Sequence, residues 1–545
     1  MDIMKKCDSL ILGKIITLDS DRIMAEAMAC RNGEIVYVGD KETAYKLCDD
    51  STKIIDYSGK YIYPGFFDSH THGSMAGQRL KFQCNLRPGN TMEEYIEILK
   101  KYIEDNPGRS SYQGAGWINR GEANRYMIDE ICNDVPVILT SADGHSMWVN
   151  SACLKDCGLD SNKAKEMGTD IVHVDENGEP TGLVSETAMM LVLSNYPPSK
   201  EDIKEGLLAW QEFAFKNGIT ACVDASGDGY PESNEAYREL VEEGKWKLRT
   251  YAYNVKKKLM FEPDKYIDAL KEDMNKYNSD YFKVIGAKFF FDGVVEAHTA
   301  YLVDGYEDNP NYHGVFNYRG KEEIAKEVIE KLNAEQIPVH IHTVGDGASK
   351  FAMDCFENAE LKNCNFTTRN CLAHLQVVKP EDIKRVSEYN VIAIVAPLWV
   401  PIEKAYFKSE VDYLGEDRAY NEYPIKSFED AGATICFHTD YPITSIVNFP
   451  KAFYIAKKRK DPVSGAKSVK NPDEAIEQYR SLLAITANAA YMVYEEDKLG
   501  KLLPGMIANC VVYDTDLLSN DIESVPNAKL LATIIDGEVV YNGEQ

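Results

Sequence analysis

The sequence lacks the features that mark membrane proteins, secreted proteins and disulfide-stabilised proteins. No apolar run approaches the 18 residues that a membrane-spanning helix needs. The 13 cysteines are odd in number and include no Cys-x-x-Cys pair, so we expect free thiols in a reducing compartment. The first eight residues lack the apolar core of a signal peptide. We therefore expect a cytoplasmic protein without a membrane span.

Basic residues are also scarce. The chain has 60 lysines and arginines against 87 aspartates and glutamates, which gives a formal net charge of −27. This surplus repels nucleic acids and anionic membranes, so neither is expected as a partner. It says little about a substrate, because a bound metal reverses the sign of the field inside a pocket. A homodimer is compatible with this composition.

The length and the order of the predicted strands indicate two domains. A chain of 545 residues is too long for one compact core, and its 44% of apolar residues is ordinary for a globular protein. Residues 7–63 contain short β-type runs separated by turns such as Arg31-Asn32-Gly33, and residues 509–514 and 530–541 look alike. We predict a small β-sandwich built from both chain termini, residues 1–63 and 490–545.

The middle of the chain alternates amphipathic helices with short apolar, β-branched runs. Strands are predicted at 135–140, 219–224, 287–291, 338–342, 370–374, 391–395 and 434–440. Such alternation over more than 350 residues favours a parallel sheet closed into a (β/α)8 TIM-like barrel, here over residues 64–489. Residues 85–200 exceed what one strand–helix unit needs, and we interpret them as an insertion over the barrel mouth.

Polar residues stand at the ends of the predicted barrel strands, where such barrels carry their chemistry. His70 and His72 are two residues apart, so on a strand both imidazoles point the same way and can share a metal ion. Asp68 shares that face and can orient a ligand. His342, His374 and Asp440 end later strands and converge on the same place. Nitrogen and carboxylate ligands suit zinc, with manganese or iron as alternatives, and a metal-bound hydroxide attacks carbonyl carbon.

A set of motifs in one order along nearly the whole chain carries a family resemblance. The motifs are Pro64-Gly-Phe-Phe-Asp-Ser-His-Thr-His72, Asp143-Gly-His-Ser146, Trp148-Val-Asn150, Gly178-Glu-Pro-Thr-Gly182, Lys288-Phe-Phe-Phe-Asp-Gly293, His342-Thr-Val-Gly-Asp346, Ala373-His-Leu-Gln376, Thr439-Asp-Tyr-Pro442 and Leu503-Pro-Gly-Met506. The chain resembles the amidohydrolase superfamily of metal-dependent barrel hydrolases. More narrowly, it is similar to the YtcJ-type family that includes N-substituted formamide deformylases.

The resemblance implies a ligand set. His70 and His72 would bind a first ion that Asp440 completes, and His342 and His374 would bind a second. Lys288 would be carbamylated and bridge both ions. The alternative is an unmodified lysine that pairs with an acid or with substrate, which leaves one ion instead of two.

Further residues are weighed against structural roles. By resemblance, His145 faces substrate and polarises its carbonyl oxygen; otherwise it is a loop histidine capped by Asp143. Trp148 and Asn150 either line the pocket or simply pack, and Asp224 either faces the pocket or caps a helix.

The chain also departs from the family pattern in two places. The run from Val294 to His298 replaces an arginine-containing run of small residues, so substrate preference can differ. His438 stands where the family usually has a small residue, and it shares a strand face with Asp440. We interpret it as a neighbour or hydrogen-bond partner, and the alternative is a metal ligand. His340, one step below His342, is interpreted as a packed or ligand-supporting histidine.

We predict a hydrolase that cleaves a C–N bond of a small, non-peptide amide by attack of a metal-bound hydroxide, with Asp440 as the proton carrier. The alternatives on the same scaffold are a deaminase, a cyclic-amide hydrolase and a non-catalytic barrel that binds metal or ligand.

Overall fold

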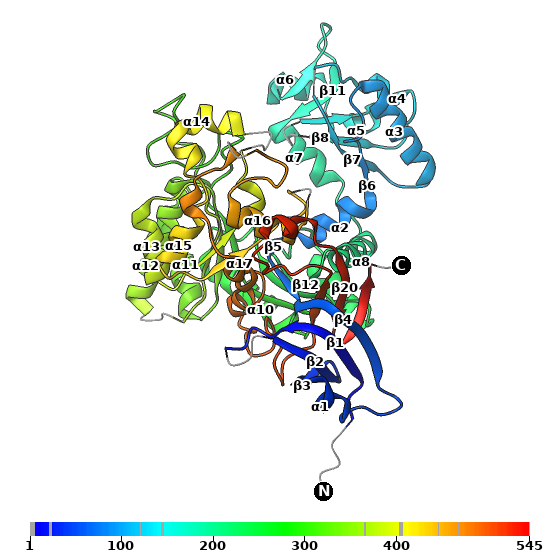
Figure 1. Cartoon of the computed structure of the whole chain (residues 1–545). Helices are drawn as coiled ribbons and strands as arrows, with labels where there is room; N and C mark the ends of the chain where they lie inside the picture. The colour runs from blue at the N-terminus through cyan, green and yellow to red at the C-terminus, as the bar shows by residue number, and fades with distance from the viewer. Residues whose placement is uncertain are drawn as a thin grey trace. The chain divides into compact units, whose positions relative to one another are not determined.

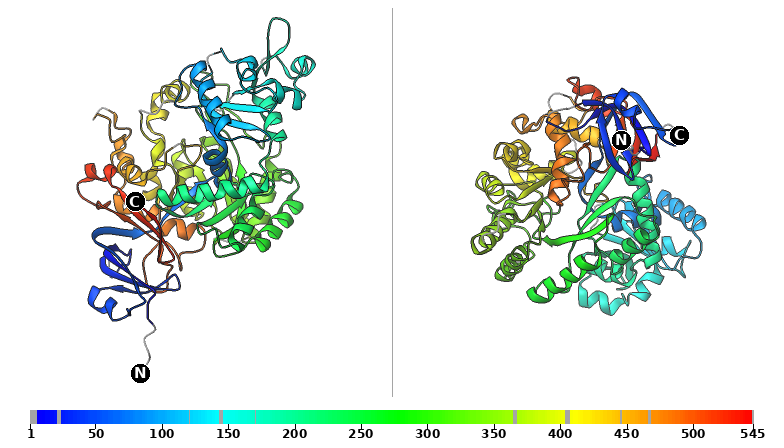
Figure 2. Two further views of the ribbon diagram at one scale, coloured as in Figure 1. Left: turned by 90° about the vertical axis from the view of Figure 1, so that its right-hand side faces the viewer. Right: turned by 90° about the horizontal axis from the view of Figure 1, so that it is seen from below.

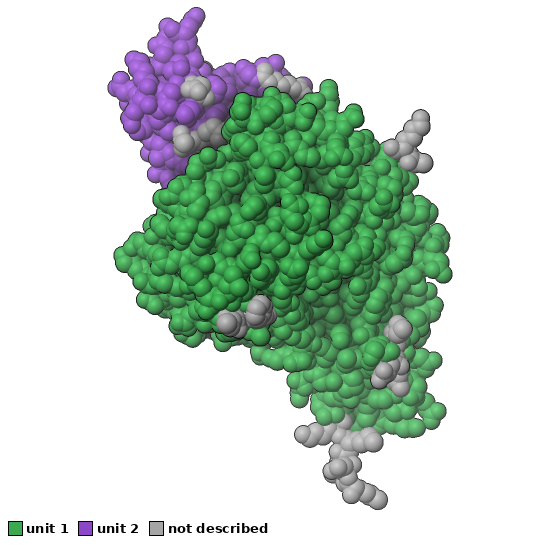
Figure 3. Space-filling view, turned by 90° about the vertical axis from the view of Figure 1, so that its left-hand side faces the viewer, with its two compact units in different colours: residues 1–73, 211–545 green, residues 74–210 purple. Residues whose placement is uncertain are grey.

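Two compact units make up the chain. The computed structural model describes residues 6–20, 24–119, 121–142, 146–169, 171–363, 367–402, 407–444, 446–465 and 468–543. One unit comprises residues 1–73 and 211–545, and the other comprises residues 74–210 (Figure 3). Among the described residues, no helix is both long and apolar enough to cross a bilayer.

The first unit contains the predicted barrel. Eight strands form one sheet with parallel pairing throughout. They are β5 (Phe66–Thr71), β12 (Ile219–Asp224), β13 (Arg249–Asn254), β14 (Phe282–Phe290), β15 (Val339–Thr343), β16 (Cys371–His374), β17 (Ile392–Val395) and β18 (Ile435–Phe437). The segment after β18 returns to β5, where Asp440 N–H donates to the His70 carbonyl (3.0 Å) and His72 N–H donates to the Tyr441 carbonyl (2.9 Å). These bonds join the two edges of the sheet at its carboxyl end.

Buried apolar side chains fill the barrel below that end. Strands covered on both faces read as continuous apolar runs, and Ile392–Val395 is buried at all four positions. Phe67, Val223, Tyr253 and Ile394 belong to one core cluster. The interior is therefore a packed core, and polar groups are left for the strand ends.

Helices between the strands cover the outside of the barrel. They include α9 (Ser233–Glu242), α10 (Pro263–Lys276), α11 (Glu322–Ala334), α12 (Asp346–Asn363), α13 (Pro380–Glu388), α15 (Ile425–Asp430), α16 (Phe449–Lys458), α17 (Gln478–Ala484) and α18 (Ala487–Met492). The 3.6-residue period places Ala325, Val328, Ile329 and Leu332 on the buried face of α11. This arrangement confirms the predicted fold class.

The two chain ends meet in one β structure, as predicted, and it is a single seven-stranded sheet; the bounds 1–63 and 490–545 stay a prediction. Its order is β21-β20-β19-β4-β1-β2-β3, so strands from both termini lie side by side (Figures 1 and 2). The strands are β1 (Ser9–Ile16), β2 (Met24–Arg31), β3 (Glu34–Gly39), β4 (Lys53–Pro64), β19 (Cys510–Tyr513), β20 (Leu530–Ile535) and β21 (Glu538–Asn542). Ile11, Met28, Ile62, Val512 and Ile534 share one buried cluster, so neither end has a core without the other.

Residues 74–210 have a sheet and cores of their own. Six strands run in the order β10-β11-β9-β8-β7-β6: β6 (Gln83–Asn85), β7 (Tyr112–Trp117), β8 (Val137–Ser141), β9 (Ser146–Val149), β10 (Val172–Val174) and β11 (Pro180–Ser185). The helices include α2 (Gly73–Phe82), α3 (Met92–Asp105), α5 (Ser151–Asp156) and α7 (Glu186–Asn195), and α8 (Lys200–Lys216) leads back to the first unit. The predicted strand at 135–140 therefore belongs to this sheet and not to the barrel. The predicted role of about 85–200 as a cover over the barrel mouth stays a prediction.

Candidate metal centre

Two histidines and an aspartate meet where β5 ends and the chain leaves β18. His70 Nε2 lies 3.3 Å from Asp440 Oδ1, and His72 Nε2 lies 3.2 Å from the same oxygen. One ligand atom from each residue lies within 4.8 Å of the other two, and all three residues are buried. The two-residue spacing on an extended backbone brings both imidazoles to one face, as expected from the strand period.

The far nitrogen of each of these rings is held by a partner. His70 Nδ1 lies 2.8 Å from His340 Nε2, and His72 Nδ1 lies 2.8 Å from Ser226 Oγ. Burial holds the pKa of His70 well below its ordinary value, so this ring is neutral. When Nδ1 donates to these partners, both Nε2 atoms present lone pairs toward the carboxylate of Asp440.

The chemistry of this donor set fits a divalent cation. Asp440 Oδ1 is buried and has no hydrogen-bond partner among the described residues, although two imidazole nitrogens lie close to it. Lone pairs and a carboxylate oxygen that converge without a proton between them repel one another, and a cation bound by nitrogen and oxygen ligands removes that repulsion. His70, His72 and Asp440 are therefore the residues that would hold an ion here.

A second group of predicted ligands adjoins the first. The ring centroids of His342 and His374 are 4.5 Å apart, and the His374 ring lies 4.9 Å from the His70 ring. Asp292 holds His342 through Nδ1 (3.1 Å) and also accepts from the backbone N–H groups of Val344 (3.1 Å) and Gly345 (2.7 Å). A carboxylate on the far nitrogen is the usual support of a metal-ligating histidine.

Lys288 is the predicted bridging residue. Its side chain is 1% exposed, and Nζ has no hydrogen-bond partner among the described residues. Burial lowers the pKa of Lys288 to about 7, so a neutral amine is readily available at physiological pH. A neutral amine, unlike an ammonium, can ligate or be carbamylated. Carbamylation of Lys288 stays a prediction.

The backbone is strained where these side chains leave the strands. His374 and Asp440 adopt left-handed conformations with φ of 81° and 56°. For a residue other than glycine, each costs on the order of 1–3 kcal/mol and persists only where the surroundings impose it. Asp68 supplies part of that support, because it accepts from the backbone N–H of Thr439 (3.0 Å) and from its hydroxyl (2.5 Å). Asp68 also accepts from the His70 backbone N–H (3.3 Å) and thus ties β5 to the Asp440 loop. Its role in orienting a metal ligand stays a prediction.

Several residues that were weighed as pocket residues make structural contacts, and their place in a pocket stays a prediction. Trp148 is buried and donates from Nε1 to the Asn124 carbonyl (2.8 Å). Asn150 caps α5 by accepting from Cys153 N–H (3.0 Å). It also accepts from the N–H of Val137, the first residue of β8 (3.0 Å). Asp224 accepts from the Tyr237 hydroxyl (2.8 Å). The predicted substrate-facing His145 lies outside the described residues.

Two contacts at the site went unnoticed in the sequence. Ser226 supports His72, and Trp399 stacks on the His374 ring at 5.3 Å and 11°. Trp399 is in turn held by a bond from Nε1 to Thr444 Oγ1 (2.6 Å). Both residues follow barrel strands by a few positions, which is the only signal that points to them.

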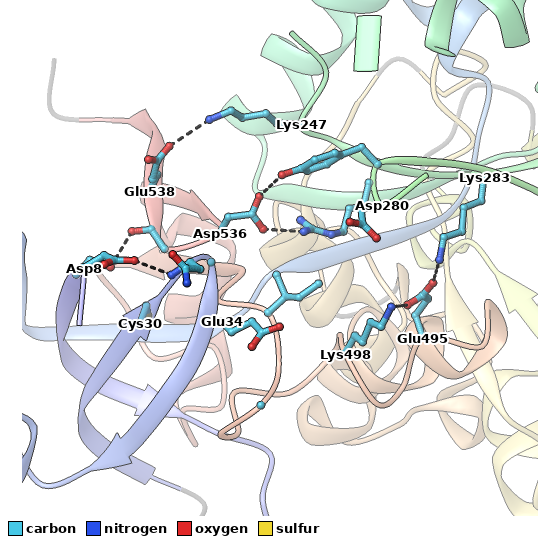
Figure 4. Close-up of a pocket in the computed structure, with 18 of the residues that line it drawn as sticks. Asp8, Cys30, Glu34, Lys247, Asp280, Lys283, Glu495, Lys498, Asp536 and Glu538 are labelled. Atoms are coloured by element: carbon cyan, nitrogen blue, oxygen red, sulfur yellow. Dashed lines mark hydrogen bonds and ion pairs between the residues drawn. The ribbon is translucent and has the colours of Figure 1, made fainter. Parts of the chain in front are cut away.

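A cavity of about 750 Å³ lies at the opposite end of the barrel (Figure 4). It lies between turns of the terminal sheet and the first residues of β13 and β14. Several of its charged side chains pair with one another, as in Lys247–Glu538 (3.1 Å) and Arg249–Asp536 (2.7 Å). None of the predicted site residues lines it. Because barrel chemistry sits at carboxyl strand ends, we assign the site to the histidine cluster and not to this cavity.

Known proteins that resemble this chain agree with the barrel fold described above. The chain is 26% identical to the putative amidohydrolase YtcJ of Bacillus subtilis over 97% of this chain and 98% of the relative. It is 23% identical to the N-substituted formamide deformylase of Arthrobacter pascens over 98% of both chains. A crystal structure of an uncharacterized metal-dependent hydrolase from Pyrococcus furiosus superposes with a TM-score of 0.77 at 26% identity, covering 94% of this chain and 100% of that one.

The family assignment rests on more than these pairwise similarities. The sequence profile of the amidohydrolase family matches residues 53–541, which span the whole barrel, the 74–210 unit and four of the seven strands of the terminal sheet, β4 and β19 to β21. All of the histidines and carboxylates described above fall within that match. The chain is a member of the amidohydrolase family.

Proposed function

We propose that this chain is a metal-dependent hydrolase that cleaves the C–N bond of a small, non-peptide amide, with water as co-substrate and an acid and an amine as products. The observation that carries the proposal is the convergence of His70, His72 and Asp440 on one buried point, with the far nitrogen of each imidazole held in place. The similarity to an amidohydrolase and to a formamide deformylase over nearly the full chain supports the choice of bond.

The chain's own residues divide the work. His70, His72 and Asp440 would hold a first divalent ion, zinc or alternatively manganese or iron, and His342 and His374 would hold a second. Bound there, such an ion polarises a carbonyl oxygen and lowers the pKa of water toward neutrality. Lys288, as an amine or a carbamate, would lie between the two groups.

Asp440 is the residue that we propose moves the proton. Its carboxylate accepts a proton from the attacking water and returns it to the departing nitrogen. Its left-handed backbone and the Asp440 N–H bond to the His70 carbonyl hold the carboxylate beside both imidazoles. We further propose that His145 polarises the substrate carbonyl.

Metal removal and a substrate panel test the proposal. The purified protein is stripped with a chelator, reloaded with Zn²⁺, Mn²⁺ or Fe²⁺, and assayed against N-substituted formamides, other amides, cyclic imides and aminopurines. We expect turnover of an open-chain amide that disappears with the metal and returns on reloading. Turnover confined to aminopurines or cyclic imides would identify a deaminase or a cyclic-amide hydrolase, and tight metal binding without any turnover would identify a binding protein.

A further inference from the structure

The histidine cluster contains a repeated contact, of which one copy is complete. His70 belongs to the candidate ligand set, and its far nitrogen is bonded to the imidazole of His340. Their ring centroids lie 4.8 Å apart, with an angle of 61° between the planes. His340 is fully buried and stands two residues before His342 on β15, one step deeper in the barrel. One imidazole thus supports another from below.

His374 and His438 have nearly the same mutual geometry without the bond. Their ring centroids lie 5.0 Å apart, with an angle of 70° between the planes. His438 stands two residues before Asp440, as His340 stands two before His342. Both rings are 2% exposed, which leaves little access to solvent.

Unmade hydrogen bonds mark both rings. His374 Nδ1 and both ring nitrogens of His438 have no hydrogen-bond partner among the described residues. A neutral imidazole carries one N–H donor and one acceptor, and leaving such a group buried and unpaired costs about 1–3 kcal/mol. Buried polar groups in native proteins are nearly always paired. A bond between the two rings would pair two of these three atoms and leave one His438 nitrogen without a partner, as His340 Nδ1 is among the described residues.

We infer that His438 is the positioning residue of His374, and that it pairs with His374 Nδ1 as His340 pairs with His70 Nδ1. A half-turn of an imidazole about its χ2 bond exchanges ring nitrogens and carbons within the same plane, so a ring nitrogen can take the place of a carbon. Rings at this separation accommodate an N–H···N bond of about 2.8–3.0 Å. His374 then keeps Nε2 unprotonated for an ion, and Trp399 holds its ring face.

The inference deepens the proposed function, because it rests on His374 being a metal ligand.

Zinc affinity measured on variants tests this role. Zn²⁺ is titrated into the stripped full-length protein in competition with a chromogenic chelator, and the Co²⁺ form is examined by visible absorption. We expect His438→Ala to weaken the Zn²⁺ affinity about 10–100-fold and to change the Co²⁺ spectrum, as loss of a ligand's partner typically does. His438→Gln, which keeps a polar group able to pair, should restore most of the affinity. His438→Leu fills the volume without a nitrogen and should behave like His438→Ala.

A double variant and a remote histidine separate this role from a general effect on the fold. Because His438 acts through His374, adding His438→Ala to His374→Ala should cause no further loss of affinity. His313, which contacts the Leu302 carbonyl away from the cluster, gives the matched control His313→Gln, with unchanged Zn²⁺ binding expected. Wild-type affinity in both His438→Ala and His438→Leu, or a further loss in the double variant, overturns the inference alone. A wild-type chain that binds no Zn²⁺ overturns the proposed function with it.

Discussion

At the scale of single residues, the candidate site depends on a few side chains. Their neighbours fix which ring nitrogen or carboxylate oxygen stays available for an ion. His70 and His72 are each held at Nδ1, so Nε2 is the nitrogen left for chemistry. Asp440 is held by its backbone and keeps Oδ1 unpaired among the described residues. Side chains that are already in position need little reorganisation free energy when an ion or a substrate binds.

Asp440 allows the sharpest prediction at this scale. Asp440→Asn keeps the shape and an oxygen that coordinates weakly, but it loses the basic site. Since general acid–base catalysis is worth roughly 10²–10⁴-fold, kcat should fall by about that factor or more while most of the metal is retained. Steady-state kinetics and metal analysis on the same preparation measure both quantities.

A structural role for Asp440 gives the opposite result. Asn caps a turn as well as Asp does, so a residue that only caps the following Tyr441-Pro442 turn would tolerate the change within a few-fold in kcat. Near-normal kcat in a metal-replete Asp440→Asn enzyme would remove Asp440 from the proposed mechanism.

At the scale of elements, the sequence predicted β12 and β14 to β18 at least in part, and it missed β13. Residues 391–395 were recognisable because every position is apolar, whereas β13 (Arg249–Asn254) begins with arginine and alternates threonine, tyrosine and alanine. All six of its residues are nevertheless buried, because tertiary contacts accommodate the polar atoms. Composition alone does not carry that information.

Glycines misled the prediction of the terminal strands. The β-type pattern over residues 9–12 and 14–18 predicts two strands divided at Gly13, but residues 9–16 form the single strand β1. Gly13 lies at a register shift, where a Cβ would come within 2.6 Å of the Ile62 side chain. Here glycine permits close approach of a neighbouring strand instead of a turn. The Arg31-Asn32-Gly33 turn was predicted correctly, with positive φ at Asn32 and Gly33.

The candidate ligands could be predicted more completely than the strands that carry them. Metal ligands are recognisable from the residue types that stand at strand ends. Among the supporting residues, only His340 was recognisable, as a packed or ligand-supporting histidine. His340 on β15 contacts His70, and Ser226, two residues after β12, contacts His72, and only the closed barrel brings these segments together. The roles of the ligand residues themselves stay predictions that the experiments above address.

A fully buried ion pair in the first unit gives a prediction at the scale of elements. Lys470 and Glu422 form an ion pair with both side chains fully buried, and Glu422 also accepts from Gln376 Nε2 (2.7 Å). Removing one partner strands a charge, so Glu422→Leu and Lys470→Met should each lower the free energy of unfolding by about 3–5 kcal/mol. The double variant should recover most of that loss. Urea unfolding of the three variants measures it.

An exposed pair provides the comparison for this ion pair. Lys216 and Glu212 lie 2.6 Å apart on α8 with both side chains more than half exposed. Glu212→Gln should change the free energy of unfolding by less than about 1 kcal/mol. Equal effects of Glu212→Gln and Glu422→Leu would contradict the importance assigned to burial.

Helix α12 contains a carboxyl group whose ionisation should oppose folding. Glu360 is 2% exposed, and burial raises its pKa from the ordinary 4.5 to about 7. A raised pKa in the folded state means that the contribution of this carboxyl to stability is fully present below about pH 4.5 and is lost as pH rises through 7. Glu360→Gln imitates the protonated form, so its melting temperature should match the wild type at pH 4.5 and exceed it at pH 8. A difference that does not change with pH would contradict the assignment.

At the scale of the whole molecule, the terminal sheet and the barrel of the first unit are joined by charged contacts around the cavity in Figure 4. The turn between β20 and β21 carries Asp536, which accepts from Arg249 Nη2 (2.7 Å) at the start of β13 and from the Tyr281 hydroxyl (2.6 Å) before β14. The Arg249 side chain is 6% exposed. One carboxylate thus connects the chain's carboxyl-terminal hairpin to two barrel strands.

Substitution of Asp536 should destabilise the protein without touching catalysis. Asp536→Ala leaves the Arg249 guanidinium buried without its carboxylate, a change that costs about 3–5 kcal/mol in buried pairs. Glu538, two residues later, pairs with Lys247 at 3.1 Å but is 68% exposed, so Glu538→Ala serves as the matched control with an expected cost below about 1 kcal/mol. Because the cavity lies at the opposite end of the strands from His70 and Asp440, kcat of the folded Asp536→Ala protein should stay within about two-fold of wild type.

Thermal unfolding and kinetics at a temperature well below the transition measure the effects of Asp536→Ala on stability and on kcat. A large loss of kcat at full occupancy of the folded state would mean that the two ends of the barrel are coupled, and an unchanged melting temperature would mean that Asp536 does not hold the sheet to the barrel.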